Sequence, residues 1–136
     1  MPGEMSSVGA GYALDIVTGR AAGPGARTMY VALLTAAPTD ATTPATMTEL
    51  SATGYSRQAA TFSAPSGDPR VSSNTAQLTF GPFTTDPANV PYLALVSSAS
   101  GTTGDLVYFW TADNARDAAI GDSITIAAGA LVCQLD

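Results

Sequence analysis

From Met29 onward the sequence consists of short apolar runs, several of period two, bounded by Gly, Pro, Asn or Asp. The pattern is clearest at residues 74–80, where Ala76, Leu78 and Phe80 alternate with polar side chains. Such alternation is typical of strands that bury one face. It predicts about seven strands, at residues 29–35, 55–64, 74–80, 92–98, 105–111, 124–126 and 131–136. The expected fold class is all-β, an antiparallel β-sandwich of the jelly-roll-like or immunoglobulin-like type.

Local features place some of these strands. Residues 29–35 are apolar on both faces, which indicates a central strand covered on both sides. Residues 92–98 and 105–111 flank a Gly-rich turn and are expected to form a hairpin. Residues 36–47 are rich in Thr, Ala and Pro without periodicity, so they are expected to form an exposed loop.

The N-terminal part carries a helical signal. Ser6 and Ser7 can cap a helix, Tyr12 and Ile16 continue it at four-residue spacing, and Gly19 can end it. Residues 21–26 are expected to be a linker. We therefore expect one domain over residues 1–136, with residues 1–28 as an arm or short helix and residues 29–136 as the sandwich. The arm is expected to extend over neighbouring subunits, so that deleting residues 1–20 would leave a folded domain that no longer attaches.

Charge excludes one class of partner. The chain has 11 acidic and 5 basic residues, a net charge of −6, and no lysine. Its arginines are scattered singly, whereas nucleic-acid binding requires a clustered positive face, so no nucleic-acid partner is expected. The sequence has no leader pattern and no apolar run long enough to span a membrane, so we expect synthesis in the host cytoplasm and no membrane partner. Cys133, the single cysteine, is expected to be a buried small hydrophobe.

The residue types needed for most catalysis are missing. The chain contains no histidine, which excludes serine triads, cysteine–histidine dyads and histidine-ligated zinc. The glutamates, Glu4 and Glu49, lie outside the predicted strands, which disfavours a glycosidase. Residues 113–117 are the nearest approach to a calcium loop and are interpreted as a solvated loop. We expect no enzyme activity, no metal and no cofactor.

The large aromatic residues leave two interpretations open. Tyr108 and Trp110 share one face of a predicted strand. They are expected either to fill the sandwich core or, in the case of Trp110 together with Phe83, to form an intersubunit contact. The candidate interface residues are Phe83, Tyr108, Trp110, Tyr12 and Ile16.

The order of segments along the chain resembles a family of small virion proteins of tailed bacteriophages, which are labelled tail fibre or head decoration proteins. The matching segments are residues 13–20 (ALDIVTGR), 29–38 (MYVALLTAAP), 54–57 (GYSR), 120–131 (IGDSITIAAGAL) and 135–136 (LD). The chain departs from the family pattern at residues 89–91, where a Trp-Gly pair is expected. The resemblance implies a particle component without enzymatic activity.

The sequence leaves two virion roles and one further class of function to distinguish. The first is a capsid decoration or cement protein, bound to the major capsid protein on the capsid surface as a homo-oligomer, expected to be a homotrimer. The alternative is a tail fibre, tail-tip or host-receptor-binding module, which glycan binding by the isolated protein would favour. The third, an enzyme or an extracellular carbohydrate-binding domain, is disfavoured by the missing histidine and leader.

Overall fold

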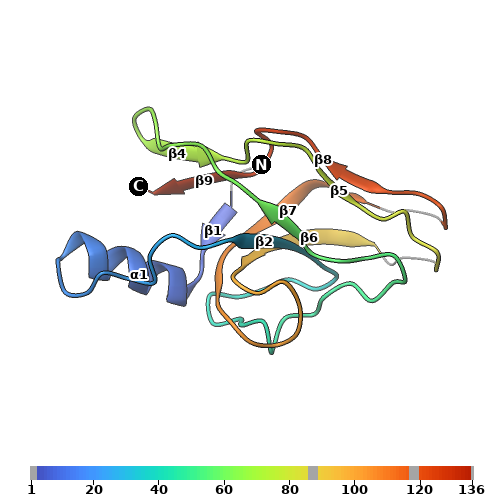
Figure 1. The fold of residues 1–136 in the computed structure, drawn as a ribbon, viewed down its shortest axis with the longest axis horizontal. Coiled ribbons are helices and arrows are strands. Elements are labelled where there is room, and N and C mark those ends of the chain that lie inside the picture. Colours follow the sequence, from blue (N-terminus) through green and yellow to red (C-terminus); the bar gives the residue numbers. More distant parts are fainter. Residues whose placement is uncertain (1–2, 86–88, 117–119, 136) are drawn as a thin grey trace.

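The computed structural model describes residues 3–85, 89–116 and 120–135, and its fold is all-β with one short helix (Figure 1). One sheet has five strands in the order β1-β7-β6-β2-β3. Two further antiparallel pairs, β4–β9 and β5–β8, lie against it (Figure 1). The five strands of the sheet are β1 (Gly3–Met5), β2 (Met29–Leu34), β3 (Gln58–Ala60), β6 (Val90–Val96) and β7 (Leu106–Arg116). The paired strands are β4 (Arg70–Ser73), β5 (Leu78–Phe80), β8 (Ile124–Ile126) and β9 (Val132–Leu135).

The central strands β2 and β6 are apolar on both faces because both faces of the sheet are covered. One face carries Leu33 and Leu93 into the main core, which the strand pairs β4–β9 and β5–β8 complete. The other face carries Leu34 and Val96 into a smaller core, against which Met47 packs. The predicted hairpin is confirmed, since β6 pairs antiparallel with β7. Because Met47 packs on the smaller core, the segment between β2 and β3 covers part of the outer face of the sheet.

Asn74 joins the two strand pairs of the second layer. It is 2% exposed and lies between β4 and β5, opposite the turn that joins β8 to β9. Its side-chain amide donates to the carbonyl oxygens of Ala76 and Ala127, at 3.0 Å each. Its side-chain oxygen accepts from the backbone N–H of Leu131 at 2.8 Å. Because a buried carbonyl or amide group without a partner is costly, these bonds stabilise the break between the two pairs.

Several predicted strand boundaries were wrong. Only Gln58–Ala60 of residues 55–64 forms a strand, because Phe62 already pairs with Asn74 of the other layer. Residues 74–77 precede β5 and are not part of it. Strand β7 continues to Arg116, so Asp113 lies in a strand and not in the predicted solvated loop.

The strands β1 and β4 were missed. Both are short, and a three- or four-residue strand shows too little alternation to be recognised. β1 pairs with Tyr108, Phe109 and Trp110 of β7, so it forms an edge of the five-stranded sheet. The interpretation of residues 1–28 as an arm separate from the sandwich is therefore wrong for Gly3–Met5. Deletion of residues 1–20 would remove a strand of the sheet.

The predicted helix is confirmed as α1 (Ser7–Val17). The Ser6 hydroxyl caps it by accepting from the Gly9 N–H at 3.1 Å and donates to the Leu106 carbonyl. Gly9 is buried against β7: a Cβ atom at this position would lie 2.2 Å from the Val107 carbonyl oxygen. Gly19, with φ of 73°, ends the helical segment because the left-handed conformation favours glycine. Close backbone packing at Gly9 thus fixes α1 on the sheet.

Two glycines of α1 give a matched test of this packing. A Cβ at Gly11 would meet nothing within 4 Å, whereas a Cβ at Gly9 would overlap the backbone of β7. We expect Gly11→Ala to raise the free energy of unfolding by up to about 1 kcal/mol through helix propensity. Gly9→Ala is expected to lower it by about 1–3 kcal/mol, as overpacking does. Urea unfolding of both variants measures the difference, and equal effects would contradict the close approach of α1 to β7.

Candidate functional site

Two candidate interface residues on β7 lie in the core. Trp110 is 0% exposed and Tyr108 is 3% exposed. The Trp110 indole N–H donates to the Val132 carbonyl at 2.9 Å, and the Tyr108 hydroxyl donates to the Gly3 carbonyl at 3.0 Å. Burial raises the pKa of Tyr108. The core interpretation therefore holds for this face of β7, because the second layer of the sandwich covers it.

Phe83 is likewise 0% exposed, although it lies in a Pro-rich loop. Its N–H donates to the Asp122 carbonyl at 3.0 Å, and its carbonyl accepts from the Gly121 N–H at 2.6 Å. Residues 86–88 of the same segment lie outside the described residues. A side chain without exposed surface cannot contact a partner while this fold is intact. The expectation of an intersubunit contact through Trp110 and Phe83 is corrected accordingly.

Tyr12 attaches α1 to the turn between β6 and β7. Its hydroxyl donates to the Asp105 carboxylate at 2.8 Å, and the same carboxylate oxygen accepts from Arg27 at 3.1 Å. The Arg27 guanidinium carbon lies 5.7 Å from the centre of the Tyr12 ring, within reach of a cation–π contact. The hydrogen bond to Asp105 raises the pKa of Tyr12. Tyr12 and Arg27, at the two ends of the segment 12–27, are therefore held by the same carboxylate.

The second half of α1 exposes three large aliphatic side chains, of which Leu14 and Val17 share one side of the helix. Leu14 is 63% exposed, Ile16 is 58% exposed and Val17 is 80% exposed. Ile16 was a candidate from the sequence, whereas Leu14 and Val17 were missed. The sequence feature that could have identified them is the low charge of α1. Asp15 is its one charged residue, whereas a solvated helix normally has a polar face. Leu14, Ile16 and Val17 are called the helix surface below.

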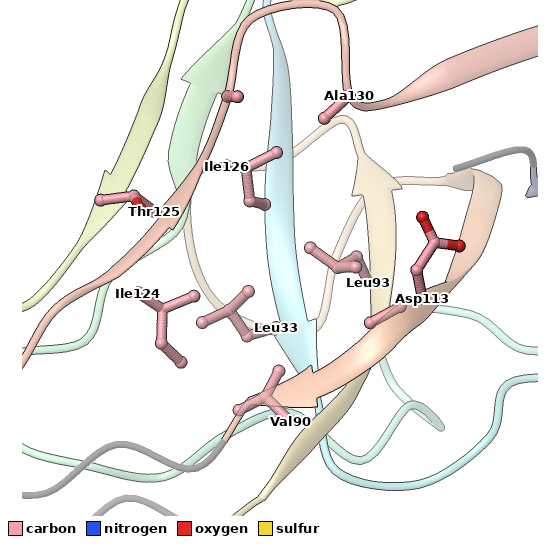
Figure 2. Close-up of a pocket in the computed structure, with 10 residues that line it drawn as sticks. Leu33, Val90, Leu93, Asp113, Ile124, Thr125, Ile126 and Ala130 are labelled. Atoms are coloured by element: carbon pink, nitrogen blue, oxygen red, sulfur yellow. The ribbon is translucent and has the colours of Figure 1, made fainter.

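A cavity of about 220 Å³ lies between the five-stranded sheet and β8 (Figure 2). Its lining is mainly aliphatic, with Asp113 and Thr125 as the polar side chains. Leu33, Leu93, Ile124 and Ile126 are buried, while Asp113 and Thr125 are exposed, so the cavity opens to the surface. Its lining residues are Leu33, Val90, Leu93, Ala112, Asp113, Ile124, Thr125, Ile126, Ala127 and Ala130. It is called the β8 cavity below.

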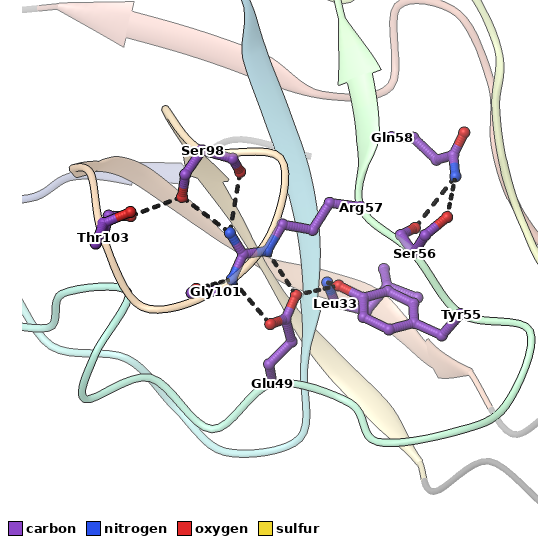
Figure 3. Close-up of polar contacts among 9 residues, drawn as sticks. All are labelled: Leu33, Glu49, Tyr55, Ser56, Arg57, Gln58, Ser98, Gly101 and Thr103. Atoms are coloured by element: carbon purple, nitrogen blue, oxygen red, sulfur yellow. Dashed lines mark hydrogen bonds and ion pairs between the residues drawn. The ribbon is translucent and has the colours of Figure 1, made fainter.

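A polar cluster around Arg57 holds the loop between β6 and β7 (Figure 3). The Arg57 side chain is 2% exposed and binds both Glu49 carboxylate oxygens, at 2.8 and 2.9 Å. The same guanidinium donates to the carbonyl oxygens of Ser98 and Gly101 at 2.9 and 2.8 Å. The Tyr55 hydroxyl donates to Glu49, and burial raises its pKa. The cluster is a structural clamp, because Arg57 ties Glu49 to the turn after β6. The hydrogen bond to Glu49 raises the pKa of Arg57.

Metal-ligating side chains are not grouped in the described part of the chain. Over residues 3–85, 89–116 and 120–135, no group of three or more His, Cys, Asp or Glu side chains is placed to hold a metal. Asp113 of the candidate calcium segment lies on β7, and Asp117 lies outside the described residues. In the part of the chain that the structure describes, no helix is long and apolar enough to cross a membrane.

Cys133, which was expected to be buried, is half-buried, and its partial burial predicts low thiol reactivity. Burial raises its pKa to about 12, so at pH 8 roughly one molecule in ten thousand carries the reactive thiolate. We expect iodoacetamide at pH 8 to leave the native protein almost unmodified and to label Cys133 fully in urea. Mass spectrometry gives both extents of labelling. Comparable labelling rates in the two states would contradict this burial.

The chain matches the model of a known protein family. A family model described as "Gp80: Podophage GP4 fiber I protein gp80" matches residues 4–134. No curated protein matches the chain. The match covers β1, α1 and the strands that follow, so it includes both the sandwich and the helix surface.

Proposed function

The chain belongs to the family of the podophage GP4 fiber I protein gp80, a family of phage structural proteins, and we propose that it is a tail fibre component. The family match over residues 4–134 is the observation that carries the proposal. The fold is consistent with such a role because a fibre component needs a stable body and not a reactive site. Within the described residues, the buried polar side chains, such as those of Arg57 and Asn74, have hydrogen-bond partners in the chain.

The helix surface supports a role in which the chain is bound to another protein. Leu14 and Val17, which are three residues apart and share one side of α1, are exposed apolar side chains of the kind found at protein contacts. The contacts of Tyr12 and Gly9 hold α1 on the sheet, so the helix surface is presented in a fixed position. A preorganised contact loses less conformational entropy on binding. The proposed partner is another protein of the tail.

The family description favours a fibre over the capsid decoration role that the sequence analysis placed first. In the decoration role, the partner of the helix surface would be the major capsid protein, and a homotrimer on the capsid surface would be the assembled form. Both roles use the same fold and differ in where the protein lies on the virion.

Immunogold labelling of purified virions separates the two roles. We expect a gold-tagged antibody against this chain to label the tail, counted by electron microscopy over several hundred particles. An excess of the purified chain should abolish the label, which controls for non-specific adsorption. Label spread over the head in many copies would reject the fibre role and support capsid decoration.

A further inference from the structure

We propose that a groove on the outer face of the five-stranded sheet binds a neutral saccharide. The groove has a volume of about 400 Å³ and is lined by residues of β1, β6, β7 and the segment that follows β2. It is called the outer groove below. The proposal goes beyond the fibre role, and binding by the isolated chain tests it without reference to the place of the protein on the virion.

The register of the sheet brings four side chains of the outer groove together. Glu4 of β1 lies opposite Phe109 of β7, and Tyr92 of β6 lies opposite Thr111 of β7. Phe109 and Thr111 are two residues apart in one strand, so they share a face of the sheet. Phe109 and Tyr92 contribute to the smaller core, which identifies this face as the outer one. Three adjacent strands therefore fix the positions of these side chains.

The outer groove combines aromatic surface with polar groups that are free to bind a ligand. Phe109 is 8% exposed and Tyr92 is half-buried, so each ring is held by the core and shows part of its surface to the groove. Glu4 and Thr111 are exposed. Among the described residues, none forms a hydrogen bond or ion pair with the Glu4 carboxylate or with the hydroxyl groups of Tyr92 and Thr111. The β8 cavity differs in that its lining is mainly aliphatic.

A pyranose ring matches this combination of groups. Its C–H groups carry partial positive charge and pack against the electron-rich faces of aromatic rings such as Tyr92 and Phe109. Its hydroxyl groups can donate to the Glu4 carboxylate and exchange hydrogen bonds with the hydroxyl of Thr111. The volume of the outer groove lies within the range of small-ligand sites, roughly 300–1,000 Å³. Both the apolar face and the polar rim of a sugar ring thus find partners in the groove.

Charge selects a neutral saccharide over an acidic one. Glu4 is the one charged side chain among the described residues that line the outer groove, and the chain has a net charge of −6. A phosphorylated or carboxylated sugar would place a like charge beside Glu4, which disfavours binding. A purely aliphatic ligand would remove water from the Glu4 carboxylate without replacing its hydrogen bonds, which is also costly. A neutral ligand rich in hydroxyl groups avoids both costs.

The test uses the full chain and substitutions in the outer groove. Thr111→Arg places a long side chain in the groove beside Glu4. Thr79→Arg is its matched control, because Thr79 is an exposed strand residue of β5 outside the groove. Glu4→Gln removes the charge and keeps the size of the side chain, whereas Tyr92→Phe removes the hydroxyl and keeps the ring. Thermal unfolding by circular dichroism verifies that each variant is folded.

The probes are an array of neutral hexose and N-acetylhexosamine oligosaccharides, with sialylated and phosphorylated oligosaccharides as the acidic set. We expect the wild type and Thr79→Arg to bind neutral members of the array and Thr111→Arg to bind none. Isothermal titration calorimetry with the best-bound neutral oligosaccharide gives affinities. Glu4→Gln is expected to bind about 10-fold more weakly, because it loses a charge-assisted hydrogen bond, and Tyr92→Phe about 3-fold more weakly.

Four results would overturn the inference: a wild type that retains no neutral oligosaccharide, a preference for the acidic set, a Thr111→Arg variant that binds like the wild type, or equal loss of binding in Thr79→Arg. Failure of the fibre role is distinguishable. Immunogold label on the head together with neutral saccharide binding rejects the fibre and retains the site, whereas label on the tail without saccharide binding does the reverse.

Discussion

Replacing Trp110 by alanine is expected to lower the free energy of unfolding by about 4 kcal/mol, within the range for truncating a buried aromatic residue. Trp110 is 0% exposed, stacks on Phe62 at 6.5 Å and packs against Tyr108 at 5.1 Å between ring centres. The truncation leaves a cavity between the two layers and leaves the Val132 carbonyl without its indole donor. Urea unfolding of the isolated chain measures the loss.

The conservative variant separates packing from hydrogen bonding. Trp110→Phe keeps an aromatic ring against Phe62 and loses the donor to Val132, so we expect it to cost less than Trp110→Ala. Both variants should show the loss at a concentration where the protein is monomeric. If Trp110→Ala keeps wild-type stability and only weakens assembly, Trp110 is an interface residue and its place in the core is wrong.

Replacing Glu49 by alanine is expected to cost about 3 kcal/mol, because it leaves a buried guanidinium without its carboxylate. The Arg57 side chain is 2% exposed, so water cannot easily replace its lost partner. The same change removes the acceptor of the Tyr55 hydroxyl. Urea unfolding at neutral pH measures the cost.

A double-mutant cycle tests whether the clamp acts as a unit. Arg57→Ala alone should destabilise the fold and also release the carbonyl oxygens of Ser98 and Gly101. The double variant is expected to cost clearly less than the two single variants added together, because neither charge then remains without its partner. Additive costs would show that the two side chains do not interact. Glu49→Gln, which retains hydrogen-bonding capacity, is the milder control.

The position of the clamp explains how a body with few charges keeps its loops in place. Arg57 precedes β3 at one edge of the sheet, and its partners Ser98 and Gly101 belong to the turn after β6. At the same turn, Asp105 binds Tyr12 and Arg27. Two arginines therefore hold one turn from two sides, and the orientation of α1 depends on the same turn.

Local signals in the sequence were sufficient for the elements whose contacts are close in the chain. The cap at Ser6, the stop at Gly19 and the run of apolar residues in β2 predicted α1 and a central strand correctly. The hairpin of β6 and β7 followed from the Gly-rich turn between them. In these cases the physical cause, a capping bond or a turn conformation, lies within a few residues. The missing histidine likewise excluded whole classes of catalysis without a structure.

Contacts distant in sequence decided the rest. β1 is a strand only because β7 offers it an edge more than a hundred residues later, and Phe62 leaves β3 because Asn74 pairs with it. A buried aromatic residue and an interface aromatic residue have the same sequence signal, so only the second layer of the sandwich settled the place of Trp110. The sequence alone thus determined the fold class and the absence of histidine chemistry. Tertiary packing decided which apolar side chains are buried and which, like Leu14 and Val17, remain exposed, because burial depends on what the rest of the chain places against each face.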